Sequence, residues 1–195
     1  GISRTRQGRY NKGHYDKKHG VSTEFGDCDG ISGTWAQLND QNNGIITYGS
    51  QDIKFHISAS PENAKEIYDL VRPVLDKYNM TFKVAVNADK LRSLKNTQVG
   101  KFMTIYLPEE ESLQVLVDLG LELDAVLSAY NKRNKSPEIL NEIKLGSSGI
   151  LTVRDEAMKR GVEKEKQTRA LQFADFFNKS KDNMVQIWNG RTEAK

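Results

Sequence analysis

Lys54 and His56 are the first residues in this sequence whose types and spacing suit chemistry. They alternate with Phe55 and Ile57 in the stretch 53–58, and strict alternation of polar and apolar residues is typical of a half-buried β-strand. Because successive side chains of a strand point to opposite faces, Lys54 and His56 are expected to share one face. A cation beside an imidazole can bind an anionic group and exchange a proton with it.

Three further stretches show the same division into an apolar and a polar face. They are Phe82-Lys83-Val84, Thr104-Ile105-Tyr106 and Thr152-Val153-Arg154. If the apolar faces pack on helices, the opposite face of the sheet carries Lys54, His56, Lys83, Tyr106 and Arg154. A polar face turned to water needs no function. This set, however, contains cations, a histidine and a tyrosine with no acid among them, and such a surface suits a phosphate group.

The residue inventory favours elimination of phosphate over its hydrolysis. Hydrolysis usually needs an activated nucleophile or a bound metal. The chain has three histidines, no metal-ligand spacing and a single cysteine, Cys28, which lies between two aspartates that disfavour its thiolate. Elimination needs only a base for the Cα proton, an acid for the departing oxygen and cations for the charge. We therefore expect no metal and no cofactor, and a single cysteine fits a reducing compartment.

The ordered motifs resemble those of a known enzyme family. Lys54-Phe55-His56-Ile57-Ser58, Phe82-Lys83-Val84 and Thr104-Ile105-Tyr106 are similar, in order and spacing, to bacterial phosphothreonine lyases of the OspF and SpvC type. The stretch 53–111 is also similar to the lyase domains of class III and IV lanthipeptide synthetases. The resemblance covers about a third of the chain.

The resemblance implies a role for each matching residue. Lys83 would be the base that takes the Cα proton, and His56 the acid that protonates the leaving phosphate. Lys54 would support the phosphate and the developing negative charge, and Tyr106 matches an active-site tyrosine. For Lys83 to act as a base its pKa must fall towards neutrality, which neighbouring cations and partial burial both promote.

The arginines of the family match less closely. Arg154 and Arg160 resemble two that bind phosphate or substrate. A third family arginine, between the second and third strands, has no clear equivalent, because Arg92, Lys95 and Lys101 compete for its position.

The elements that must position these residues indicate an α+β fold. We expect a small, mostly antiparallel sheet from strands at 53–58, 82–86, 102–107 and 150–154, with helices on its apolar face and the active site on its polar face. A helix capped by Ser60, with Pro61 in its first turn, should be kinked or split at Pro73. Further helices are expected at 88–95, after the acidic residues 109–111 as far as about 131, from 136 onward, and at the carboxyl terminus.

The chain of 195 residues, with 37% hydrophobic and 28% charged residues, suits one core. We predict an irregular, basic arm and loops over 1–50 and one lyase-like domain over 51–195. The arm is either a solvated tail or an electrostatic contact for a phosphorylated partner. No apolar run is long enough to span a membrane. A net charge of +3 is low for a nucleic-acid binder and argues against that function.

Three functions stay open on the sequence. The first is a secreted bacterial virulence effector that acts in the host cytosol on a phosphorylated protein, such as the activation loop of a MAP kinase-like enzyme. The second is a cytoplasmic lyase of lanthipeptide biosynthesis, although the chain carries no kinase or cyclase motif. The third is a phosphopeptide-binding module without catalysis.

Overall fold

One antiparallel sheet carries most of the residues singled out above. The computed structural model describes residues 21–28, 35–38, 53–78, 80–107, 111–131, 136–155 and 161–193. Within these ranges a six-stranded sheet has the order β3-β5-β6-β4-β8-β7, and every neighbouring pair is antiparallel. Its strands are β3 (Trp35–Leu38), β4 (Ile53–Ser58), β5 (Thr81–Ala85), β6 (Lys101–Tyr106), β7 (Ile143–Lys144) and β8 (Leu151–Asp155).

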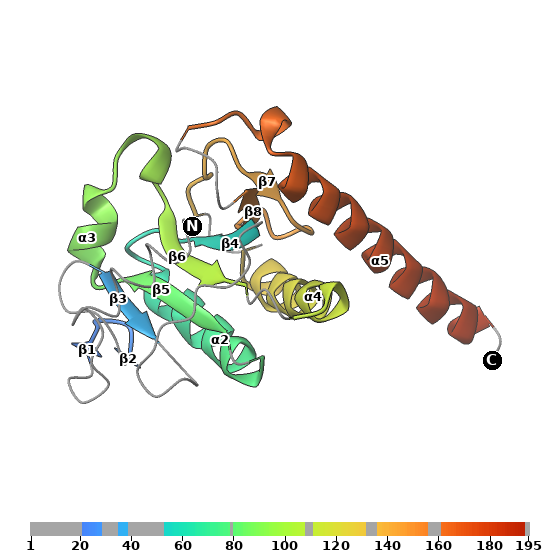
Figure 1. The fold of residues 1–195 in the computed structure, drawn as a ribbon. Helices are drawn as coiled ribbons and strands as arrows, with labels where there is room; N and C mark the ends of the chain where they lie inside the picture. Colours follow the sequence, from blue (N-terminus) through green and yellow to red (C-terminus); the bar gives the residue numbers. More distant parts are fainter. Residues whose placement is uncertain are drawn as a thin grey trace.

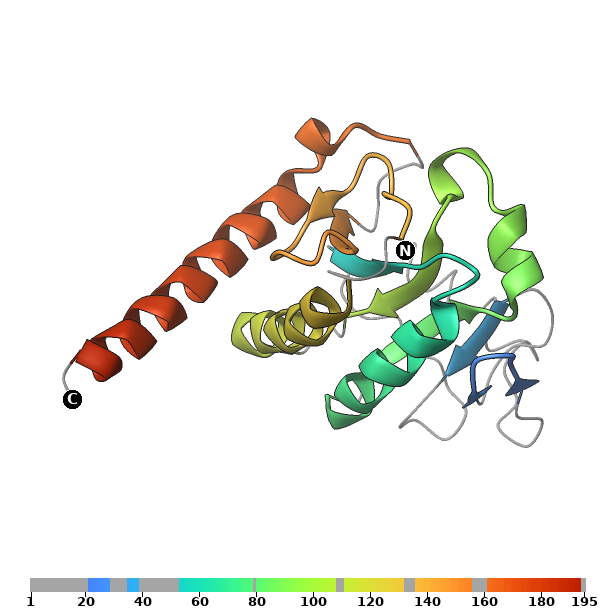
Figure 2. The same cartoon turned by 180° about the vertical axis from the view of Figure 1, so that it is seen from behind.

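Helices cover one face of this sheet. They are α2 (Ala64–Lys77), α4 (Leu113–Asn131) and α5 (Thr168–Glu193), while the short helix α3 (Ala88–Ser93) directly follows β5. Helices α2 and α4 lie side by side, and α5 passes β7 and β8 before it extends away from the body of the protein (Figures 1 and 2). No helix in the described ranges has both the length and the apolar character that crossing a bilayer requires.

The core lies between these helices and the apolar face of the sheet. Phe55 pairs with Ile105 on one side and Val153 on the other, and all three side chains are fully buried. The ring of Phe55 also lies 5.5 Å from that of Phe173 in α5. Burying apolar side chains of this size contributes about 1.5–3 kcal/mol each. The predicted α+β fold, with an antiparallel sheet and helices on its apolar face, is confirmed.

Part of the amino-terminal segment joins this structure. Strand β3 pairs with β5 at one edge of the sheet, and a two-stranded ribbon forms from β1 (Val21–Ser22) and β2 (Asp27–Cys28). Between them Phe25 is buried and meets Phe102 edge to face at 5.0 Å. The basic arm, residues 1–20, lies outside the described residues, and the division of the chain at residue 50 stays a prediction.

Helix α2 differs from its prediction at its start and at Pro73. It begins at Ala64 after the cap residue Asn63, because Ser60–Asn63 closes a turn in which Asn63 Oδ1 accepts the N–H of Ser60 at 2.8 Å. The expected start at Ser60 and Pro61 is therefore one turn too early. Nor does Pro73 split the helix, which continues to Lys77 with Val74 and Leu75 buried in the core; packing outweighs the missing N–H.

The segment after α4 also differs. Residues 136–139, predicted as a helix, have no regular structure, since the chain here is held by contacts with the sheet. The carbonyl of Pro137 accepts a hydrogen bond from the Ser58 hydroxyl. The path then turns and leads Glu142 towards His56. The ends of the four predicted strands agree with the structure to within one residue.

Candidate active site

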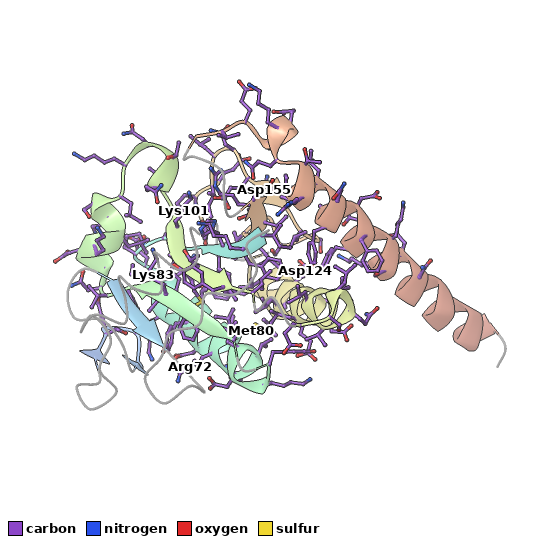
Figure 3. The ribbon with its side chains drawn as sticks, viewed as in Figure 1. Arg72, Met80, Lys83, Lys101, Asp124 and Asp155 are labelled. Atoms are coloured by element: carbon purple, nitrogen blue, oxygen red, sulfur yellow. The ribbon has the colours of Figure 1, made fainter. Side chains whose placement is uncertain are left out.

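Thr104 lies between the two residues predicted to exchange protons with the substrate. It pairs with His56 across β4 and β6 and with Lys83 across β5 and β6, so the three form one row of the sheet. Figure 3 labels Lys83 on β5. Residues directly opposite one another in antiparallel strands point to the same face. The backbones of His56 and Lys83 are therefore two strand spacings apart, or about 10 Å. A lysine and a histidine side chain are long enough to reach one substrate residue from the two sides.

The adjacent row is centred on Lys54. This residue pairs with Tyr106 in β6 and with Arg154 in β8, and it lies two residues, or about 7 Å, from His56 along β4. The register therefore brings all five residues of the predicted polar face onto one side of the sheet. Their roles stay predictions.

A polar face without function is expected to be exposed to water, but this one is mostly buried. His56 and Arg154 are each 3% exposed, and Thr104 and Tyr106 are similarly buried, while Lys54 and Lys83 are partly buried. Burying charged and polar groups costs free energy unless they are paired. A cationic face that is kept buried is more informative than an exposed one, because perturbed, buried ionisable groups gather at functional sites.

Glu142 is an acid on this face that the sequence did not reveal. Its Oε1 lies 2.7 Å from His56 Nδ1 and accepts the Thr152 hydroxyl at 2.6 Å, while its Oε2 lies 3.2 Å from Lys101 Nζ. The carboxylate is buried. The expectation that this face holds no acid is wrong, because Glu142 comes from the loop before β7 and not from a predicted strand. Its only sequence signal is an acid in the mixed stretch 139–145, which has apolar residues on both sides of it.

The carboxylate determines which nitrogen of His56 carries a proton. An ionised carboxylate only accepts hydrogen bonds, so Nδ1 must donate to Glu142. In the neutral imidazole Nε2 is then the acceptor, and in the charged form it becomes an acid. Burial, together with the neighbouring Lys54 and Lys101, lowers the pKa of His56 to about 4 against the raising effect of Glu142. His56 is thus neutral at pH 7 before an anion arrives.

Glu142 itself stays ionised. Burial favours its neutral form, but the neighbouring His56 and Lys101 and the Thr152 hydroxyl outweigh burial and hold its pKa at about 2. A neutral His56 supplies no charge at pH 7, so the lasting source of positive charge is the Lys101 ammonium at 3.2 Å.

Lys101 reaches this face through a β-bulge. The register of β4 with β6 shifts between two neighbouring residues: Ile57 pairs with Met103, but Ser58 pairs with Lys101. The extra residue is Phe102, which turns into the core. Without the bulge, simple alternation would place Lys101 on the apolar face with Met103. Figure 3 labels Lys101 on β6, next to the strand that carries Lys83.

The remaining predicted phosphate ligands lie elsewhere. Arg92 is exposed on α3 and pairs with Asp89 at 2.8 Å, and Lys95 is exposed just after that helix. Of the three residues that competed for one position, the structure brings only Lys101 into contact with the site. Arg160 lies outside the described residues. Within the described ranges no three His, Cys, Asp or Glu side chains are grouped as metal ligands.

The sequence matches the family described as RamC, N-terminal domain, over residues 28–182. No curated protein matches the chain. Among solved structures it is similar to the type III effector and phosphothreonine lyase OspF from Shigella flexneri, with 14% identity and a TM-score of 0.53 over 70% of this chain and 71% of that one.

Two further structures show the same likeness. The plasmid virulence C protein SpvC of Salmonella has 16% identity and a TM-score of 0.53, covering 84% of this chain and 80% of its own. The phosphothreonine lyase effector VirA of Chromobacterium violaceum has 16% identity and a TM-score of 0.53, covering 75% and 72%. At these identities the likeness concerns the fold, and at that level the predicted resemblance is confirmed.

Proposed function

Because the chain belongs to the family of RamC N-terminal domains and shares the fold of phosphothreonine lyases, we propose that it is a lyase that eliminates phosphate from phosphothreonine or phosphoserine. The observation that supports this most is the row in which Lys83 and His56 flank Thr104 on one buried face. A base and an acid on either side of one small residue suit the removal of two groups from adjacent carbons.

In the proposed reaction the neutral amine of Lys83 takes the proton from Cα of the substrate. The electrons of that C–H bond become the second bond between Cα and Cβ, and the Cβ–O bond breaks. The departing phosphate oxygen keeps the bonding pair and takes a proton from Nε2 of His56. The products are inorganic phosphate and a dehydroamino acid, and neither water nor an oxidant takes part.

The other residues stabilise charge. Lys54 lies beside His56 and would neutralise the phosphate and the enolate-like charge on the substrate carbonyl. Arg154 and Tyr106, which flank Lys54, would contact phosphate or substrate, and Arg160 is proposed as a further ligand. Lys101 would act mainly through Glu142, whose carboxylate it contacts.

The arrival of the substrate would itself charge the acid. A phosphate dianion beside His56 favours the imidazolium, which raises the pKa of His56 from the low value that burial imposes. Glu142 remains opposite Nδ1 and stabilises the second proton. Glu142 is thus a positioning residue that keeps Nε2 directed at the leaving oxygen.

We further propose that the substrate is a phosphorylated protein, and that the chain acts as an effector secreted into a host cell, on an activated kinase. The similar structures from Shigella and Chromobacterium are described as effectors, and this favours the effector over the biosynthetic lyase. Because the product cannot be rephosphorylated at the same residue, the reaction would be an irreversible switch.

Mass spectrometry tests the proposal. The protein is incubated with a phosphothreonine peptide in the presence of EDTA, and we expect a product one water lighter than the dephosphorylated peptide. Lys83→Ala and His56→Gln should abolish this product while they retain peptide binding, whereas the exposed Lys95→Ala serves as the matched control. A hydrolysed product would overturn elimination, and binding without any mass change would identify a phosphopeptide-binding module.

A further inference from the structure

Gln167 is a fully buried amide just before α5, with 0% of its surface exposed. Its Nε2 donates to the carbonyl of Asn141 at 2.6 Å and to that of Val162 at 3.0 Å. Its Oε1 accepts the backbone N–H of Asp155 at 3.3 Å. One side chain therefore connects the backbone at three points, residues 141, 155 and 162.

Two of these points adjoin a residue of the candidate site. Asn141 directly precedes Glu142, and Asp155 directly follows Arg154. The arrangement indicates that Gln167 holds the parts of the site that come from outside the central strands.

The contact with Asn141 has the clearest consequence. Asn141 has a φ of +60°, a left-handed conformation that turns the chain sharply just before Glu142. Its side-chain amide donates to the carbonyl of Gly161 at 3.4 Å, so the turn is held from two directions. Without the Gln167 donor the Asn141 carbonyl would lose a short hydrogen bond, and the direction in which Glu142 leaves the turn would be less well defined.

The contact with Asp155 ties the same amide to α5. Asp155 Oδ1 accepts the N–H of Ala170 at 2.6 Å, in the first turn of that helix, and Figure 3 shows Asp155 where β8 approaches the start of α5. Acidic groups are favoured at helix amino termini. Helix α5 thus anchors Gln167, and Gln167 in turn anchors the turn before Glu142.

We propose that Gln167 is a positioning residue of the lyase site, which acts on His56 through Asn141 and Glu142. The expected loss of kcat rests on the proposed function, whereas the expected change in the imidazole tautomer does not. Gln167 itself does not touch substrate. It holds the carboxylate in the one orientation that keeps Nδ1 protonated and Nε2 directed outward.

The test uses Gln167→Leu, which removes both donors at similar volume, with Gln172→Leu at an exposed position of α5 as its matched control. Elimination is followed with a phosphothreonine peptide, and the His56 tautomer by nitrogen NMR of the ring. We expect kcat to fall about 10- to 100-fold, KM to stay within about twofold, and the single Nδ1–H form to give way to a mixture. Gln172→Leu should change none of these.

A double-mutant cycle with Glu142→Gln distinguishes positioning from simple stability. If Gln167 acts through Glu142, Gln167→Leu has little further effect on kcat once Glu142 has been changed. Independent, multiplying effects, or an unchanged tautomer and kcat in Gln167→Leu, would overturn the proposal. Gln167→Glu, which keeps the acceptor but not the donors, gives the same test if the leucine variant fails to fold.

The NMR arm separates the two proposals. If the wild-type protein eliminates no phosphate, the proposed function fails, while the change in the His56 tautomer still decides whether Gln167 positions the imidazole.

Discussion

His56 Nδ1 donates to Glu142 Oε1 over 2.7 Å, and both side chains are buried. The two residues come from the central strand and from a loop 86 positions later. The pair directs Nε2, the second ring nitrogen, away from the carboxylate. It also places a permanent negative charge behind an imidazole that is neutral at rest, so that the charge can stabilise a proton gained with the substrate.

Glu142→Gln should lower kcat for elimination by about 10- to 100-fold while KM changes little. The amide oxygen can still accept from Nδ1, but the charge that stabilises the imidazolium is lost. Steady-state kinetics with a phosphothreonine peptide would measure this. Glu138→Gln is the matched control, because Glu138 is an exposed acid in the same loop that pairs with Lys144 at 3.4 Å. Equal activity of the two variants would contradict the role given to Glu142.

Stability should fall as the pH is lowered from about 6.5 towards about 4. Burial depresses the pKa of His56 from 6.5 to about 4 in the folded protein, so over this window the unfolded state binds more protons and is favoured by acid. The loss reaches about 3 kcal/mol at most. Urea denaturation at several pH values would measure it, and His56→Asn should flatten the slope. Below about 4.5 the depressed pKa of Glu142 adds a second loss in the same direction.

Lys101→Met should reduce both elimination and stability. It leaves the buried Glu142 carboxylate without the ammonium that lies 3.2 Å away, and a buried charge that loses its partner typically costs about 3–5 kcal/mol. Arg92→Ala and Lys95→Ala, at exposed positions, should leave kcat/KM within about twofold and stability within about 0.5 kcal/mol. A larger kinetic effect from either exposed residue would show that the missing family arginine is replaced there instead.

Gly146→Ala should destabilise the fold by about 2–4 kcal/mol. Gly146 has a φ of +68°, and a Cβ there would collide with the buried Asp124 carboxylate. That carboxylate accepts the N–H groups of Ser147 and Ser148 at 3.0 and 3.1 Å. Gly161→Ala is the comparison, because its φ is +81° but the nearest atom to its Cβ would be Thr97 Cγ2 at 3.7 Å. Strain alone should cost about 1 kcal/mol, and chemical denaturation would compare the two.

The alternation of residue types by itself determined β4, β5, β6 and β8 and which of their side chains share a face. Lys54 and His56 share a face because side chains of a strand repeat every two residues. The same period assigned Lys83, Tyr106 and Arg154 to the polar faces of their own strands. The fold class followed, since four apolar faces require helices to cover them. The end of α2 did not follow, because packing of Val74 and Leu75 outweighs the local preference of Pro73.

Only the tertiary structure decided the register, the burial and the partners of these residues. Placing Thr104 between His56 and Lys83 depends on pairings between strands, and Lys101 reached the polar face through a bulge that alternation cannot predict. Glu142 and Gln167 come from segments without periodic pattern. Their importance arises from contacts across tens of residues, and such long-range contacts leave no local signal in the chain.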